Sequence, residues 1–147
     1  MITARLIKEL AAEIRRATAG LKLEAEYPAQ EVAVNVFEQV LPREAYESTS
    51  YLPFVAVEFL SVKDDLQTHS TIRIGLTIAT YAPDYKGWLD AAHVMEVLRL
   101  HMLTNRVIGK RFRLEGELSF ETPDTQPEAF FYILGEATYS TMQPAGC

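Results

Sequence analysis

The residues best suited to chemistry are few and lie far apart along the chain. His69, His93 and His101 are the three histidines, and Cys147 is the single cysteine. On one helix, His93 and His101 would lie about 80° apart and two turns along, which is too far to share a metal ion. No serine lies in a G-x-S-x-G motif, and the scattered glycines form no phosphate loop. The sequence therefore predicts a protein that is not an enzyme and needs no metal or cofactor.

One weaker candidate surrounds His93. Asp90 and Glu96 lie three residues on either side of it, so the three side chains are spaced to gather on one helix. This spacing allows a cluster of two carboxylates and a histidine. It equally allows ordinary pairing between neighbours on a helix surface.

The composition is that of a globular protein. The 147 residues are 48% apolar and 23% charged, which is typical of one domain spanning residues 1–147. The net charge of −6 argues against generic binding to phosphate backbones. No apolar run reaches the roughly 20 residues that span a bilayer, and charged residues interrupt the first twenty. We therefore expect a protein that folds in a reducing cytoplasm.

Charge is unevenly distributed along the chain. Residues 1–22 hold five basic and two acidic side chains, whereas residues 23–67 hold two basic and nine acidic ones. These unlike segments are suited to attract each other, within one chain or between copies. They are also consistent with solvated faces.

The periodicity of apolar residues predicts two helices, over Thr3–Ala19 and Lys86–Leu103. On the second helix we expect one buried stripe, with Asp90 facing away from it. Strand patterns cover residues 32–37, 54–62, 71–81, 111–120 and 129–142, and we expect the second and third to pair antiparallel. The expected stripe consists of Trp88, Ala91, Ala92, Met95, Leu98 and Met102.

This order of elements predicts an α+β fold, with an antiparallel or mixed sheet of about five strands and two main helices on one face. Fifteen aromatic residues are available for packing, seven Phe, seven Tyr and one Trp. Several of them fall in the last strand, which is apolar on both faces. They indicate either a tight core or a subunit interface.

Several short motifs occur in a particular order between residues 51 and 142. They are a Y-x-P-F-V strand, an I-R-I-G strand, a G-W-x-D helix start, an N-R-x-I-G-x-R-F junction and E-x-P-x-x-Q-P before an aromatic last strand. This ordered set resembles the tail terminator, or tail completion, family of minor tail proteins in bacteriophages and prophages. One departure is Leu52, inserted between Tyr51 and Pro53. The junction comprises Asn105, Arg106, Ile108, Gly109, Arg111 and Phe112.

The resemblance implies a structural virion protein. Such proteins form a homo-oligomeric ring, expected to be a hexamer, which ends growth of the tail tube and supports head–tail joining. The implied partners are further copies of the chain, the tail tube protein and the head–tail connector protein. DNA would meet the ring only by passing through its lumen, and no membrane is involved. The implied location is the host bacterial cytoplasm during assembly and then the virion tail.

The junction is the most basic part of the second half of the chain. Its cationic residues are Arg106, Lys110, Arg111 and Arg113. We expect them at a subunit contact or lining the lumen. Salt bridges to the chain's own acids are the alternative.

Two other functions remain open at this point. One is another head–tail connector or neck protein of similar size. The other is a small α+β ligand-binding module or enzyme that uses His93 with Asp90 in a pocket.

Overall fold

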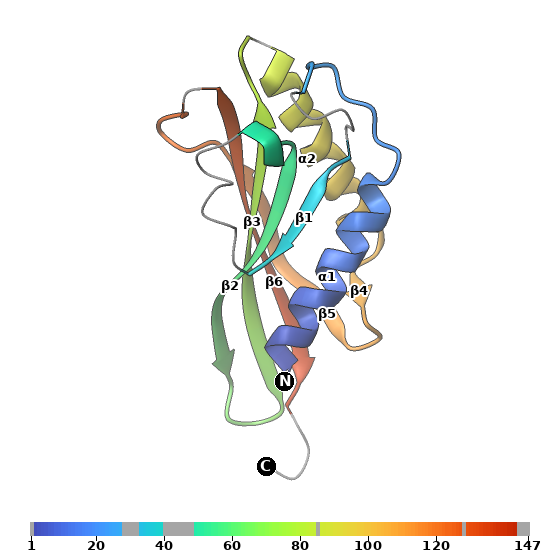
Figure 1. Cartoon of the computed structure of the whole chain (residues 1–147). Coiled ribbons are helices and arrows are strands. Elements are labelled where there is room, and N and C mark those ends of the chain that lie inside the picture. The colour runs from blue at the N-terminus through green and yellow to red at the C-terminus, as the bar shows by residue number, and fades with distance from the viewer. Residues whose placement is uncertain (1, 28–32, 40–48, 85, 128, 144–147) are drawn as a thin grey trace.

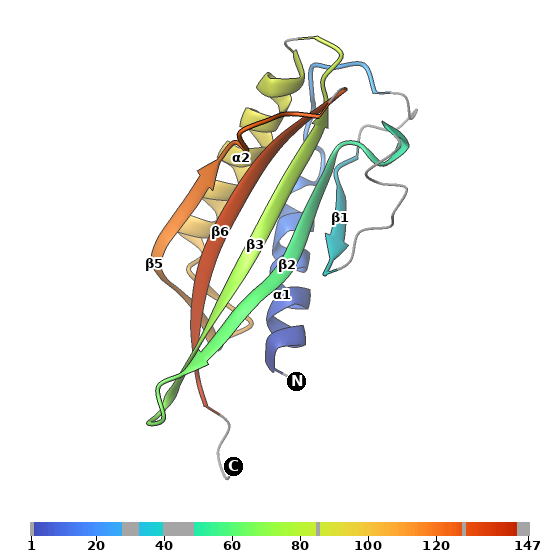
Figure 2. The same ribbon diagram turned by 90° about the vertical axis from the view of Figure 1, so that its left-hand side faces the viewer.

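The computed structural model describes residues 2–27, 33–39, 49–84, 86–127 and 129–143. Six strands form one mixed sheet, and both helices cover the same face of it (Figures 1 and 2). The α+β prediction is therefore confirmed. The elements are α1 (Ile2–Thr18), β1 (Asn35–Glu38), a 3-10 turn (Thr49–Tyr51), β2 (Phe54–Asp64), β3 (His69–Tyr81), α2 (Lys86–Thr104), β4 (Val107–Ile108), β5 (Phe112–Glu121) and β6 (Phe130–Met142).

The strands are ordered β1-β2-β3-β6-β5-β4 across the sheet. β1 runs parallel to β2, and every other neighbouring pair is antiparallel, including the expected pair of β2 and β3. The sixth strand is β4, which has only two residues and lies where we expected merely the end of a helix. Such a short strand gives no periodicity that a sequence pattern can reveal.

The first helix matches its prediction closely. Its buried side chains recur every three or four residues, as Leu6, Leu10 and Ile14 show. This spacing places them on one face, which packs on the sheet. Gly20 follows the helix with φ of 75°, the left-handed conformation that commonly ends a helix.

Two apolar clusters sandwich the sheet. The larger one lies between the helices and the sheet, and it contains the alternating residues of β3 that we expected to face one way, Ile72, Ile74, Leu76 and Ile78. The smaller one lies on the helix-free face, where Phe54, Ala56 and Phe130 are buried beside Phe37 and Tyr132. The first half of β2 is therefore covered on both faces. Many of the aromatic residues accordingly belong to the core.

The side of α2 that packs on the sheet differs from the side that the sequence pattern predicts. Trp88 is 49% exposed, whereas Asp90 is only 1% exposed and Val94 is fully buried. The expected orientation of Asp90 was therefore wrong. Apolar residues occur on every side of α2, so the pattern alone does not fix which side meets the sheet. The residues buried on α2 are Gly87, Asp90, Ala91, Val94, Leu98 and Met102.

The first predicted strand and the loop after it have bounds that the structure describes only in part. The first expected strand, over residues 32–37, begins only at Asn35, where the pairing with β2 starts. Val34 comes before that pairing, and Val32 lies outside the described residues. Pro42 and most of the expected loop at 43–50 also lie outside the described residues.

No helix in the described ranges is both long and apolar enough to cross a membrane.

Candidate assembly surface

The basic junction leaves α2 and turns directly into β5. Asn105 Nδ2 donates to the carbonyl of His101 at 3.0 Å, and Arg106 Nε donates to that of Leu103 at 3.1 Å, so both side chains help to end the helix. Gly109 and Lys110 then adopt φ of 58° and 61°, which gives the tight turn between β4 and β5 the form of type I′. This turn presents the cationic side chains at one edge of the sheet.

The four predicted cationic residues are all exposed, and they point to different places. Lys110 and Arg111 line a groove of about 580 Å³ together with Arg5 of α1, which sequence reasoning missed. Arg113 pairs with Ser140 in the ladder and lies on the helix-free face. In the part of the chain that the structure describes, none of the four enters an ion pair. The alternative of salt bridges to the chain's own acids is therefore not realised among these residues.

Arg111 is the most tethered of the four. Its Nε donates to Thr141 Oγ1 at 3.4 Å, and its guanidinium carbon lies 5.6 Å from the centre of the buried Phe112 ring. A cation over an aromatic face is attracted by the ring quadrupole. Arg111 thus keeps its charge at the surface while its stem covers the core.

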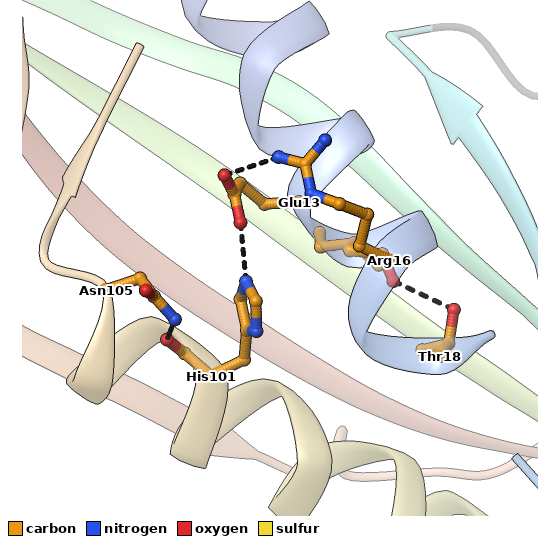
Figure 3. Close-up of polar contacts among 6 residues, drawn as sticks. Glu13, Arg16, Thr18, His101 and Asn105 are labelled. Atoms are coloured by element: carbon orange, nitrogen blue, oxygen red, sulfur yellow. Dashed lines mark hydrogen bonds and ion pairs between the residues drawn. The ribbon is translucent and has the colours of Figure 1, made fainter. Parts of the chain in front are cut away.

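A polar bridge joins the two helices just before the junction (Figure 3). His101 Nε2 lies 2.6 Å from Glu13 Oε2, and Arg16 donates to the other oxygen of Glu13 at 2.5 Å. Burial alone would raise the pKa of Glu13, but the hydrogen bonds from His101 and Arg16 outweigh it and hold that pKa below its ordinary value. The bridge therefore fixes the end of α2, and with it the start of the junction, against α1.

Tyr139 lies beneath these helices in the core. Its side chain is fully buried, and its hydroxyl has no hydrogen-bond partner among the described residues. Burial raises the pKa of this phenol, and the negative charge of Glu13 raises it further. The hydroxyl is therefore neutral and takes no part in the bridge.

Asp90 clamps the segment that follows α1 onto the start of α2. Its carboxylate accepts the backbone N–H groups of Glu24 and Ala25 at 2.6 and 2.9 Å and the Tyr27 hydroxyl at 2.8 Å. Burial, followed by the bond to Asp90, raises the pKa of Tyr27. Asp90 is thus a buried structural residue, contrary to the expectation that it faces away from the core.

The other candidate groups do not come together. His93 is exposed and makes no bond to Asp90, so the predicted pairing of these two residues in a pocket is not formed. Glu96 instead pairs with Arg99 at 3.0 Å. His69 lies in the β2–β3 hairpin, and the described residues contain no group of three potential metal ligands.

Apolar side chains are exposed on the outer face of α2. Leu100 is 71% exposed, and Leu89 and Leu103 are each 40% exposed. On the flank of α1, a mainly apolar groove of about 570 Å³ lies between the first turns of that helix and the ends of β1 and β2. Neither feature was predicted, because both depend on how the helices are rotated against the sheet.

No family model matches this sequence, and none of the curated proteins gives a significant match to it.

Proposed function

We propose that this chain is a structural virion protein that assembles into a ring at the end of a phage tail tube, terminates tube growth and supports head–tail joining. The observation that supports the proposed self-assembly is the outer face of α2. A surface helix normally turns polar side chains outward, and an apolar outer face marks a surface that another protein covers. Leu100 and Leu103 form such an apolar patch near the end of α2, and Leu89 is exposed further along the same side.

The ordered motifs support the specific role. The helix start at Gly87–Trp88, the junction at Asn105–Phe112 and the aromatic last strand follow one another as in the tail terminator family. In the fold, these motifs lie at the start of α2, at the tight turn between β4 and β5, and in β6 between β3 and β5.

The basic junction supports a contact outside the chain. Arg106, Lys110, Arg111 and Arg113 are exposed and lack acidic partners among the described residues. Such charges suit either an acidic partner surface or a lumen that conducts DNA. Another connector or neck protein would use the same features, so the functional test must separate the two roles.

The test has two parts. Multi-angle light scattering of the purified chain at micromolar concentration should show a closed oligomer of fixed copy number, and the oligomer should cap isolated tail tubes. A chain that stays monomeric contradicts the ring. A ring that binds head connectors and ignores tube ends favours the connector role instead.

The junction has its own test. Lys110→Glu combined with Arg113→Glu reverses two exposed charges and spares Arg111, which touches the core. We expect infectivity to fall at least tenfold in a complementation assay. Loss of assembly would assign the junction to a subunit contact, and intact assembly with lost infectivity would assign it to the lumen. If both were unchanged, the proposed role of the junction would be wrong.

A further inference from the structure

A groove of about 580 Å³ lies where the start of α1, the turn between β4 and β5 and the end of β6 come together. These three segments lie toward the same end of the molecule (Figure 1). We call this cavity the basic groove. No acidic side chain is among the described residues that line it. The lining residues are Arg5, Gly109, Lys110, Arg111, Thr141 and Met142.

The three cations of the basic groove are not neutralised within the described part of the chain. None of them enters an ion pair there, although the sequence has 20 acidic residues and only 14 basic ones. Glu9 of α1 is close by, since a Cβ placed on Gly109 would lie 3.2 Å from the Cγ of Glu9. Among the described residues, however, Glu9 forms no ion pair. The groove therefore keeps an excess of positive charge, which attracts an anion.

A buried hydroxyl in the groove also favours an anion. Thr141 is only 3% exposed, and it lines the groove beside Arg111. Its Oγ1 accepts the Nε–H of Arg111 at 3.4 Å, and it donates to no acceptor among the described residues. A buried donor without an acceptor is costly, and an anion in the groove would accept its hydrogen. The same hydroxyl holds the Arg111 side chain in place for that anion.

Lys110 has a backbone conformation that disfavours lysine. Its φ of 61° lies in the left-handed region, at a turn position where glycine or asparagine is usual. Residues held in such conformations cluster at binding sites, where the side chain is needed. The turn by itself would be served better by glycine. Its geometry therefore indicates that the charge of Lys110 is what this position requires.

The other cations of the junction do not extend the groove into a row. Arg113 lies on the helix-free face, and Arg106 Nε donates to the carbonyl of Leu103. A DNA backbone presents a long row of phosphates and suits a protein with a stripe of cations. A compact group of two guanidinium groups and one ammonium suits a carboxylate, which guanidinium can bind with two parallel hydrogen bonds.

From these observations, we propose that the basic groove binds carboxylate side chains of an acidic segment on a partner protein. Arg5 and Lys110 supply charge, and Arg111 and Thr141 donate hydrogen bonds to the bound carboxylate. The inference rests on the proposed function in placing that partner among the virion proteins, and it names the chemistry of the contact.

A peptide probe tests the groove directly. A fluorescein-labelled oligoglutamate peptide is titrated with the full chain and followed by fluorescence anisotropy, with oligoglutamine as the uncharged control. Oligoglutamate should bind with saturation, whereas oligoglutamine should not. Added salt should weaken the binding, because it screens exposed charges.

Two variants assign the binding to the groove. Arg5→Ala and Lys110→Gly should each weaken it about tenfold, the loss expected for one charged hydrogen-bond partner. Lys110→Gly should keep or raise the midpoint of thermal unfolding, because glycine adopts this conformation freely, so its lost binding cannot be put down to misfolding. Lys110→Arg keeps the charge and should keep the binding. Lys63→Ala is the matched control, because it removes an exposed cation that does not line the groove.

A cross-link covers the case in which a second copy already fills the groove. Carbodiimide joins a lysine amine to a carboxylate held beside it, and peptide mapping by mass spectrometry locates the link. Lys110 should be joined to the peptide or to an acidic residue of another copy. Mixing isotope-labelled and unlabelled chains separates a link between copies from one to Glu9 of the same chain. A link to Glu9 alone counts against the inference.

Three results would overturn the inference. One is the absence of peptide binding together with the absence of any intermolecular link at Lys110. Another is equal peptide binding by the wild type, Arg5→Ala and Lys110→Gly. The third is tighter binding of a mixed-sequence DNA duplex that both variants weaken, which would identify a phosphate site.

Light scattering of the same samples separates this inference from the proposed function. A ring that shows any of these three results leaves the proposed function intact and removes only the carboxylate site. A monomer that binds oligoglutamate through the groove supports the site and contradicts the ring.

Discussion

The two helices lie side by side on one face of the sheet, but their outer surfaces differ (Figure 1). The outer side of α1 carries Arg5, Lys8 and Arg15, which water solvates readily. The outer side of α2 carries Leu100 and Leu103, which water does not favour. The two helices of one layer therefore expose different side chains, charged on α1 and partly apolar on α2. We propose that a partner covers the exposed leucines of α2.

The strongest test of this comparison contrasts the two sides of α2. Leu98 is fully buried and Leu100 is 71% exposed, although they are two residues apart. Leu98→Ala should lower the free energy of unfolding by about 2–5 kcal/mol, because it leaves a cavity in the core. Leu100→Ala should change the stability of the monomer by less than about 0.5 kcal/mol. Urea denaturation at low protein concentration measures both, and equal losses would contradict the assigned rotation of α2.

A smaller effect is expected at the clamp that holds α2 in that rotation. Asp90→Ala leaves two backbone N–H groups and the Tyr27 hydroxyl without their acceptor, which should cost about 2 kcal/mol of stability. Glu96→Ala, on the exposed side of the same helix, is the control and should be nearly neutral. Thermal unfolding followed by circular dichroism measures the pair. If the Asp90→Ala variant were as stable as the wild type, the clamp would be absent.

The smallest effect concerns the bridge between the helices. The pKa of Glu13 lies below its ordinary value of 4.5, so the carboxylate stabilises the fold above that pH. The stabilisation is lost as the pH falls from 4.5 through the lower pKa of the folded state. Glu13→Gln should therefore reduce stability at pH 7 by less than about 1 kcal/mol, and the difference should shrink as the pH falls below 4.5. Urea titrations at a series of pH values give the profile.

Glu117→Gln provides the reference for that profile, because Glu117 is exposed on β5 and takes no part in the bridge. The free energy of unfolding of this variant should match that of the wild type throughout the series. A Glu13→Gln difference that persists unchanged at the lowest pH would show that the side chain acts through packing rather than charge.

The contrast between the helices also explains what the sequence could predict. In α1, apolar and charged residues alternate at helical spacing, so Leu6, Leu10 and Ile14 were assigned to the core correctly. The alternation in β3 was equally clear. In α2, apolar residues occur all round the helix, and the pattern left its rotation undetermined. The buried carboxylate of Asp90 was missed for that reason.

The candidate surface was predicted only in part. Basic composition was enough to single out Arg106, Lys110, Arg111 and Arg113, because these residues are close in sequence. Arg5 lines the same groove as Lys110 and Arg111, but more than a hundred residues separate it from them. The groove beside α1 and the exposure of Leu100 and Leu103 on α2 depend on contacts between distant elements. No local pattern encodes such surfaces, and β4 was likewise too short to be seen.

The most direct test of the account is the mass of the purified wild-type chain under native conditions. Native mass spectrometry, with sedimentation velocity over a range of micromolar concentrations, should show one closed species, expected to contain six copies, and no larger open chains. A monomer at every concentration would contradict the ring and the interpretation of the exposed leucines of α2 as a surface that another copy covers.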